Sequence, residues 1–197
     1  MKKPIALTLL AMMLAATPCL AGELPLTLAG FTLGQDMARY EQHCEGPALI
    51  IPDIPFLTEM NLSPDAVPGI RGGSLTHGNC LGERKLLRVK LKFHETSQKF
   101  FNELVKEYTA RFGKPGSYQG DAFRNVIAWQ WDFSSDGQAM SVMVMWSRDK
   151  EMRPGVSIKM TLESGVQAEY ECFLTASDRQ ARRAPTAIRS LDDFIPR

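Results

Sequence analysis

Residues 127–146 read IAWQWDFSSDGQAMSVMVMW, and this stretch decides the fold class. Large apolar side chains occupy every second position in two runs, from Ile127 to Phe133 and from Met140 to Trp146. A period of two is typical of half-buried β-strands, and the intervening Ser-Ser-Asp-Gly is typical of a hairpin loop. A third alternating run, residues 156–162, follows the turn at Arg153-Pro154-Gly155. The three runs predict an antiparallel meander.

A helix is predicted before this meander, over residues 98–112. Its apolar side chains recur at helical spacing, at Phe101, Val105, Tyr108 and Phe112. Ser97 can cap its start, and Gly113 with Pro115 ends it.

The first half of the chain suggests a similar order of elements. Residues 87–93 alternate like a half-buried strand, and we expect them to pair with residues 69–76 through a turn-rich loop at 77–82. A shorter helix is predicted over residues 35–44, because its apolar positions share one helical face, and Gly46-Pro47 would end it.

These patterns predict an α+β protein made of two tandem repeats, with the helices on one face of antiparallel sheet. The first repeat, α-β-β, covers residues 22–95, and the second, α-β-β-β, covers residues 96–163. A C-terminal segment, residues 164–197, follows. Residues 164–176 fit a helix or a strand equally well, and from Ser177 onward we expect a mobile tail.

A long proline-rich loop is predicted within the first repeat, over residues 48–68. It carries the apolar side chains Ile54, Phe56 and Leu57 between prolines. Long loops in compact domains are often functional, so these three residues are candidates for contact with a partner. The alternative is that they cover the edge of the core.

The N-terminus has the features of a secretory signal peptide. Lys2 and Lys3 precede an apolar run at residues 5–16, and cleavage is expected after Ala21. The run is too short to span a bilayer. Lipidation at Cys19 is the rival interpretation, but the preceding Ala16-Thr17-Pro18 matches a lipoprotein signal poorly. We therefore expect a periplasmic or secreted protein.

Cleavage would leave three cysteines, Cys44, Cys80 and Cys172. In an oxidising compartment three thiols suggest one disulfide and one spare. The sequence leaves all three pairings open. We favour Cys44 with Cys80, which would tie the end of the first predicted helix to the predicted hairpin loop.

The net charge and its distribution indicate which classes of partner the protein could bind. The chain has 23 Lys and Arg against 22 Asp and Glu, and residues 1–21 contain two lysines and no acid. The rest is thus nearly neutral, which argues against nucleic-acid binding. One predicted strand nevertheless carries a row of basic residues, Arg88, Lys90 and Lys92. It is either a solvated sheet face or a docking surface for an anionic envelope partner.

No enzyme motif is present, and no cofactor or metal is expected. Two weaker alternatives remain. One is a hydrolase whose nucleophile is Cys80, three residues after His77. The other is a small-molecule or Cu(I)-binding protein, because Met143 and Met145, with Met152 and Met160 nearby, could supply thioether ligands.

The order of elements resembles a known class of envelope domains. Residues 30–34, a short helix and Gly46-Pro47 look like the pattern of small domains related to the SmpA/BamE outer-membrane-assembly lipoproteins, and Phe112-Gly113-Lys114-Pro115 is similar to the same element again. Tandem α-β units also build the β-lactamase-inhibitory-protein family. The resemblance implies a non-enzymatic periplasmic domain that binds other proteins. It leaves the oligomeric state open.

Overall fold

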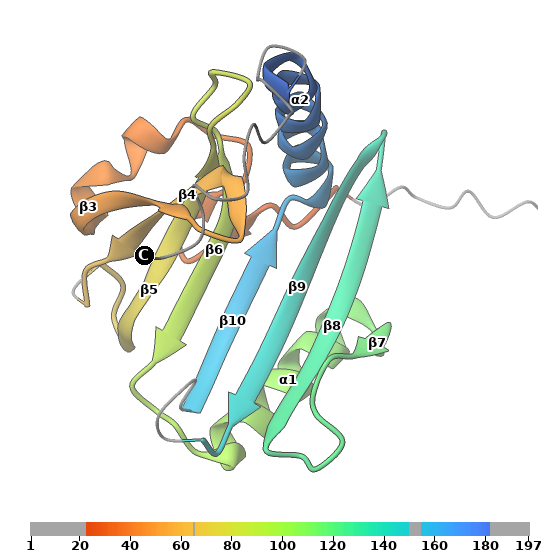
Figure 1. Cartoon of the computed structure of the whole chain (residues 1–197). Coiled ribbons are helices and arrows are strands. Elements are labelled where there is room, and N and C mark those ends of the chain that lie inside the picture. Colours follow the sequence, from red (N-terminus) through yellow and green to blue (C-terminus); the bar gives the residue numbers. More distant parts are fainter. Residues whose placement is uncertain (1–22, 65, 150–154, 182–197) are drawn as a thin grey trace, which may run out of the picture.

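Two strands far apart in the sequence, β6 (Leu86–Phe93) and β10 (Gly155–Thr161), pair antiparallel at the centre of one large sheet. The computed structural model describes residues 23–64, 66–149 and 155–181. In this part of the chain the sheet has eight strands in the order β3-β4-β5-β6-β10-β9-β8-β7, and every pair is antiparallel (Figure 1). The other six strands are β3 (Cys44–Ile51), β4 (Ile54–Leu62), β5 (Ile70–Gly78), β7 (Ser117–Tyr118), β8 (Val126–Ser135) and β9 (Gln138–Ser147).

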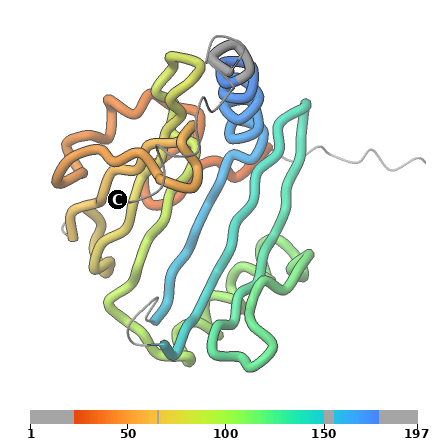
Figure 2. The backbone as a smooth tube through the Cα atoms, in the orientation of Figure 1, coloured from red at the N-terminus to blue at the C-terminus, as the bar shows by residue number. Residues whose placement is uncertain are grey.

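Two α-helices accompany the sheet, α1 (Gln98–Phe112) and α2 (Glu163–Ala181). They lie toward opposite ends of the strands (Figure 2). A small hairpin, β1 (Thr27–Leu28) with β2 (Phe31–Thr32), and two 3-10 turns, Met37–Arg39 and Glu41–His43, precede the sheet.

The predicted fold class is wrong. The chain is mostly β, with one continuous eight-stranded sheet, a two-stranded sheet and only two α-helices among the described residues, and it is not a pair of tandem helix-plus-strand repeats. The strands of the two predicted repeats form one continuous sheet, because β6 pairs with β10.

The helix predicted over residues 35–44 is replaced by the two 3-10 turns. The Gln35 carbonyl, which an α-helix would bond to Arg39 N–H, accepts instead from Leu86 N–H at 2.8 Å. Met37 N–H also donates outside the segment, to the Arg84 carbonyl at 2.7 Å. Asp36 also accepts a bond from Ala38 N–H and caps only a short turn. Tertiary hydrogen bonds have overridden local propensity here.

The proline-rich loop predicted over residues 48–68 is largely a β-hairpin. Pro52 and Asp53 form the turn between β3 and β4, and Ile51 pairs with Ile54 across it. β3 is an edge strand with irregular register, a position that tolerates proline because its outer side needs no ladder bond.

Other expectations are confirmed. β5 and β6 pair as predicted, α1 begins and ends where its caps indicated, and β8, β9 and β10 form the predicted meander. Ser97 accepts a hydrogen bond from Phe100 N–H at 3.2 Å. Of the two possibilities for residues 164–176, the helix is correct, and it continues to Ala181. The rest of the predicted tail and the signal peptide lie outside the described residues.

The core lies on one face of the sheet. Rings of α1 pack there against β8: Tyr108 lies 5.5 Å from Trp131, and Phe112 lies 5.2 Å from Phe133, between ring centroids. The buried cluster is completed by strand residues such as Leu75, Val89, Val144 and Ile158 and by Phe31, Leu33, Met37 and Tyr40 from the N-terminal segment. The opposite face, called here the polar face, carries different chemistry.

Candidate functional site: the polar face of the sheet

Basic side chains gather at the centre of the polar face. Because side chains alternate along a strand, Arg88, Lys90 and Lys92 of β6 point away from the buried Val89 and Leu91. Lys159 of β10 pairs directly with Lys90. We call these four residues, Arg88, Lys90, Lys92 and Lys159, the basic strip. Lys92 is exposed and the other three are half-buried.

Unpartnered polar atoms lie beside the basic strip. Thr76 and Thr161 are the cross-strand neighbours of Arg88 on its two sides. The hydroxyl oxygens of both threonines and Arg88 Nε are buried, and none of the three has a hydrogen-bond partner among the described residues. Buried polar groups are usually bonded, so these three atoms are exceptions, but they lie below the surface of the polar face and are not part of its exposed binding surface.

Acidic and apolar residues flank the basic strip. On β4, Glu59 accepts a hydrogen bond of 3.0 Å from the Ser74 hydroxyl, and on β8 Asp132 lies near the far edge of the sheet. Met143 and Met145 of β9 are half-buried on the same face, with Met143 directly opposite Lys159. The polar face thus combines a cationic centre with adjacent apolar thioethers.

The sequence-predicted contact residues Ile54, Phe56 and Leu57 lie at one end of β4 and do not form one surface. Leu57 is fully buried in the core. Phe56 packs against α2, with ring centroids 5.4 Å from Tyr170 and 5.9 Å from Phe173. Ile54 is half-buried.

The exposed apolar residues of this hairpin are instead Leu49 and Ile50 of β3, at 55% and 62% exposure. Sequence reasoning missed them because it assigned the segment to a loop. It also missed Lys159, whose position beside Lys90 depends on a strand pairing that local sequence does not show.

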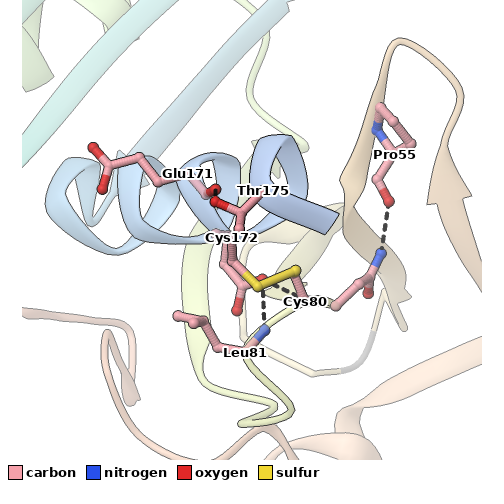
Figure 3. Close-up of a disulfide and its surroundings, with 8 residues drawn as sticks. Pro55, Cys80, Leu81, Glu171, Cys172 and Thr175 are labelled. Carbon is pink, nitrogen blue, oxygen red and sulfur yellow. Dashed lines mark hydrogen bonds between the residues drawn. A yellow bond between two sulfur atoms is a disulfide. The ribbon is translucent and has the colours of Figure 1, made fainter. Parts of the chain in front are cut away.

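The favoured disulfide is also wrong. Cys80 is bonded to Cys172 (Figure 3). Cys44 is a free thiol. Cys44 lies at the start of β3, where it pairs with Leu62, whereas Cys80 lies in the β5–β6 loop against α2. The disulfide therefore attaches the C-terminal helix to the sheet.

Hydrogen bonds reinforce this attachment. Glu169 of α2 is 3% exposed, and its carboxylate accepts bonds from Cys80 N–H at 2.7 Å and Leu81 N–H at 3.3 Å. Asn79 Nδ2 donates to the Pro55 carbonyl at 3.1 Å, which joins the loop to the start of β4 (Figure 3). The junction holds α2 rigidly at the end of the sheet.

The Cys80 nucleophile hypothesis fails, because a sulfur atom in a disulfide is not a thiolate. His77 is buried, and its Nδ1 donates to the Gly78 carbonyl at 2.8 Å. In the described part of the chain, His, Cys, Asp and Glu form no cluster that could hold a metal ion. Met160 is buried on the face opposite Met143 and Met145, so these thioethers do not converge, and Met152 is outside the described residues.

No protein-family model, curated protein or solved structure matches the chain. The site's chemistry therefore rests on its own geometry. Neither described helix has the length and apolar character needed to cross a membrane.

Proposed function

We propose that this is an exported, non-enzymatic binding protein of the cell envelope, and that it docks an acidic segment of a partner protein on the basic strip. The observation that carries the proposal is the direct pairing of Lys90 with Lys159 between Arg88 and Lys92. The pairing places two lysines opposite each other on neighbouring strands, so that, with Arg88 and Lys92, four cationic residues share one face of the sheet and create a positive field that favours an anionic ligand.

The surroundings of the basic strip favour a polypeptide over a simple ion. Three residues of the basic strip, Arg88, Lys90 and Lys92, lie at every second position along β6, a spacing that matches an extended chain with acidic side chains at intervals. Met143 and Met145 offer an adaptable apolar surface beside the charges. An acidic protein segment that also carries apolar side chains satisfies both features.

Export is supported by the signal-like N-terminus, with Lys2 and Lys3 before an apolar run. The disulfide between Cys80 and Cys172 fits the same view, because disulfides persist in oxidising compartments.

The test is site-specific photo-crosslinking in intact cells. A photoreactive residue in place of Lys92 should capture an acidic protein, and capture should be lost when Lys90→Glu and Lys159→Glu are combined. The control combines Lys106→Glu and Lys114→Glu, which make the same charge change at exposed positions on α1 and just beyond it. Thermal unfolding of each variant reports whether it is folded.

The outcomes separate the alternatives. Loss of the captured protein in the basic-strip variant, with retention in the control, supports the proposal. Equal capture by both variants overturns it. Capture of lipopolysaccharide with no protein also overturns it, because the partner would then be a lipid surface.

A further inference from the structure

A pocket of about 600 Å³ lies in the N-terminal segment, and it shares no residue with the basic strip. Its wall is formed by the turn of the β1–β2 hairpin and by the two 3-10 turns, and Ala66 closes one side. This volume is within the range of small-molecule sites.

Three hydrogen-bond donors of the pocket come from one short stretch, Arg39, Tyr40 and His43. The Arg39 guanidinium has one partner among the described residues, Gln35 Oε1 at a long 3.4 Å. The Tyr40 hydroxyl accepts a bond from Thr32 N–H at 3.1 Å, but its own proton has no acceptor in the described part of the chain. Tyr40 is 8% exposed, so this unused donor is held in place by the core.

The described lining of the pocket supplies no carboxylate to balance these donors. None of the described residues that line the pocket is Asp or Glu. Two acids beside the lining residues of the 3-10 turns are engaged elsewhere: Glu41 forms an ion pair of 2.7 Å with Arg84, and Asp36 caps the first 3-10 turn. The pocket therefore presents a guanidinium and a phenol proton, and its described lining residues provide no counter-charge.

Aromatic rings fix the shape of the pocket. Phe31 meets Tyr40 and His43 edge to face, with centroids 5.4 Å and 5.8 Å apart. Phe31 is 3% exposed and belongs to the main core. Because these rings are packed, the Tyr40 hydroxyl is preorganised, which lowers the entropic cost of binding.

We propose that this pocket binds a small organic carboxylate. The planar guanidinium of Arg39 matches a carboxylate bidentately, and the Tyr40 hydroxyl donates a further bond to the same group. The rings of Phe31 and His43, with Ala66, contact the apolar body of the ligand. One guanidinium suits one negative charge, which favours a monocarboxylate over a phosphate.

The experiment is calorimetric titration of the full chain with benzoate, benzamide and inorganic phosphate. Benzoate should bind, and benzamide, its neutral analogue, should bind at least tenfold more weakly. Arg39→Gln should weaken benzoate binding at least tenfold, and Tyr40→Phe, which keeps the ring, should weaken it severalfold. Arg111→Gln is the control, because it removes the same charge from α1, where Arg111 lies over the Phe112 ring.

Each outcome of the titrations either supports or overturns the proposed carboxylate site. Equal binding of benzoate and benzamide, or no binding of benzoate, overturns the carboxylate site, and so does undiminished binding by Arg39→Gln. Tighter binding of phosphate than of benzoate overturns the ligand class. Unfolding temperatures equal to that of the unaltered protein show that a loss of binding is local. The basic strip plays no part in these measurements, so either proposal can fail alone.

Discussion

Glu169 Oε2 accepts a 2.7 Å hydrogen bond from the backbone N–H of Cys80, a residue that precedes it by 89 positions. The same oxygen accepts from Leu81 N–H, so one buried carboxylate satisfies two consecutive amides of the β5–β6 loop. Gly78 makes room for it, since a Cβ there would lie 2.0 Å from Glu169 Oε1. Loop, helix and disulfide thus depend on one another.

Glu169→Ala should lower the free energy of unfolding by about 1–3 kcal/mol, because two buried N–H groups would lose their acceptor. Denaturant unfolding of the oxidised protein measures this loss. Glu171→Ala is the control, since Glu171 is exposed and, among the described residues, its carboxylate accepts a hydrogen bond from the Gln167 side chain on the same helix. Equal losses in both variants would show that Glu169 has no special role.

Removing the disulfide should lower the free energy of unfolding by more than Glu169→Ala does. The bridge joins residues separated by 92 positions, and closing a loop of that length contributes about 4.5 kcal/mol in the chain-entropy description. Cys80→Ser combined with Cys172→Ser should lose most of this in equilibrium unfolding. Cys44→Ser should change stability far less. If Cys44→Ser is as damaging as the double variant, the assigned pairing is wrong.

Cys44 should react slowly with alkylating reagents. Burial raises the pKa of its thiol, and the nearby negative charge of Glu41 raises that pKa further. The thiolate is the reactive form, so at pH 8 a raised pKa reduces the rate. Glu41→Gln should lower the pKa and speed iodoacetamide labelling of the peptide that contains Cys44, as followed by mass spectrometry.

Glu45→Gln is the matched control for this measurement, because it removes an equal charge from the adjacent residue, which does not contribute to the raised pKa of Cys44. A similar acceleration in both variants would contradict the assignment to Glu41.

The β8–β9 turn allows a test of backbone conformation alone. Asp136 and Gly137 both have positive φ, +49° and +76°, and a Cβ added to Gly137 would touch nothing within 4 Å. Gly137→Ala should therefore cost about 1 kcal/mol of stability through backbone strain. Gly116→Ala, at a position without positive φ and with its closest contact at 3.5 Å, should be nearly neutral in thermal unfolding.

The sequence pattern predicted an element correctly where residues close together in the chain determine its structure. Helix α1 and the meander could be predicted because their periodicity and caps lie within a few residues of each other. Residues 35–44 could not, because the groups that stop an α-helix there belong to residues 84–86. Residues 54–62 also alternate, but Pro55 and the nearby Pro52 and Pro64 suggested a loop, whereas these residues form β4, between β3 and β5 in the sheet.

Some residues of the candidate site could likewise be placed from local spacing, whereas others depend on the pairing of distant strands. Arg88, Lys90 and Lys92 could be placed on one face from their spacing alone. Lys159 could not, because nothing local places β10 beside β6. The disulfide partner of Cys80 was equally hidden, since Cys172 meets the β5–β6 loop only after α2 has packed against β4.

The disulfide also determines how the molecule would respond to tension. Any force applied through the chain ends passes across the bond between Cys80 and Cys172, so the intervening residues, which include β6, α1 and the meander, carry no load. At about 3.5 Å per residue, roughly 300 Å of contour length is shielded. Pulled under oxidising conditions, the protein should therefore extend by that much less than the reduced form. Five of the eight strands of the sheet, β6 to β10, would keep their arrangement while β3, β4 and β5 yield.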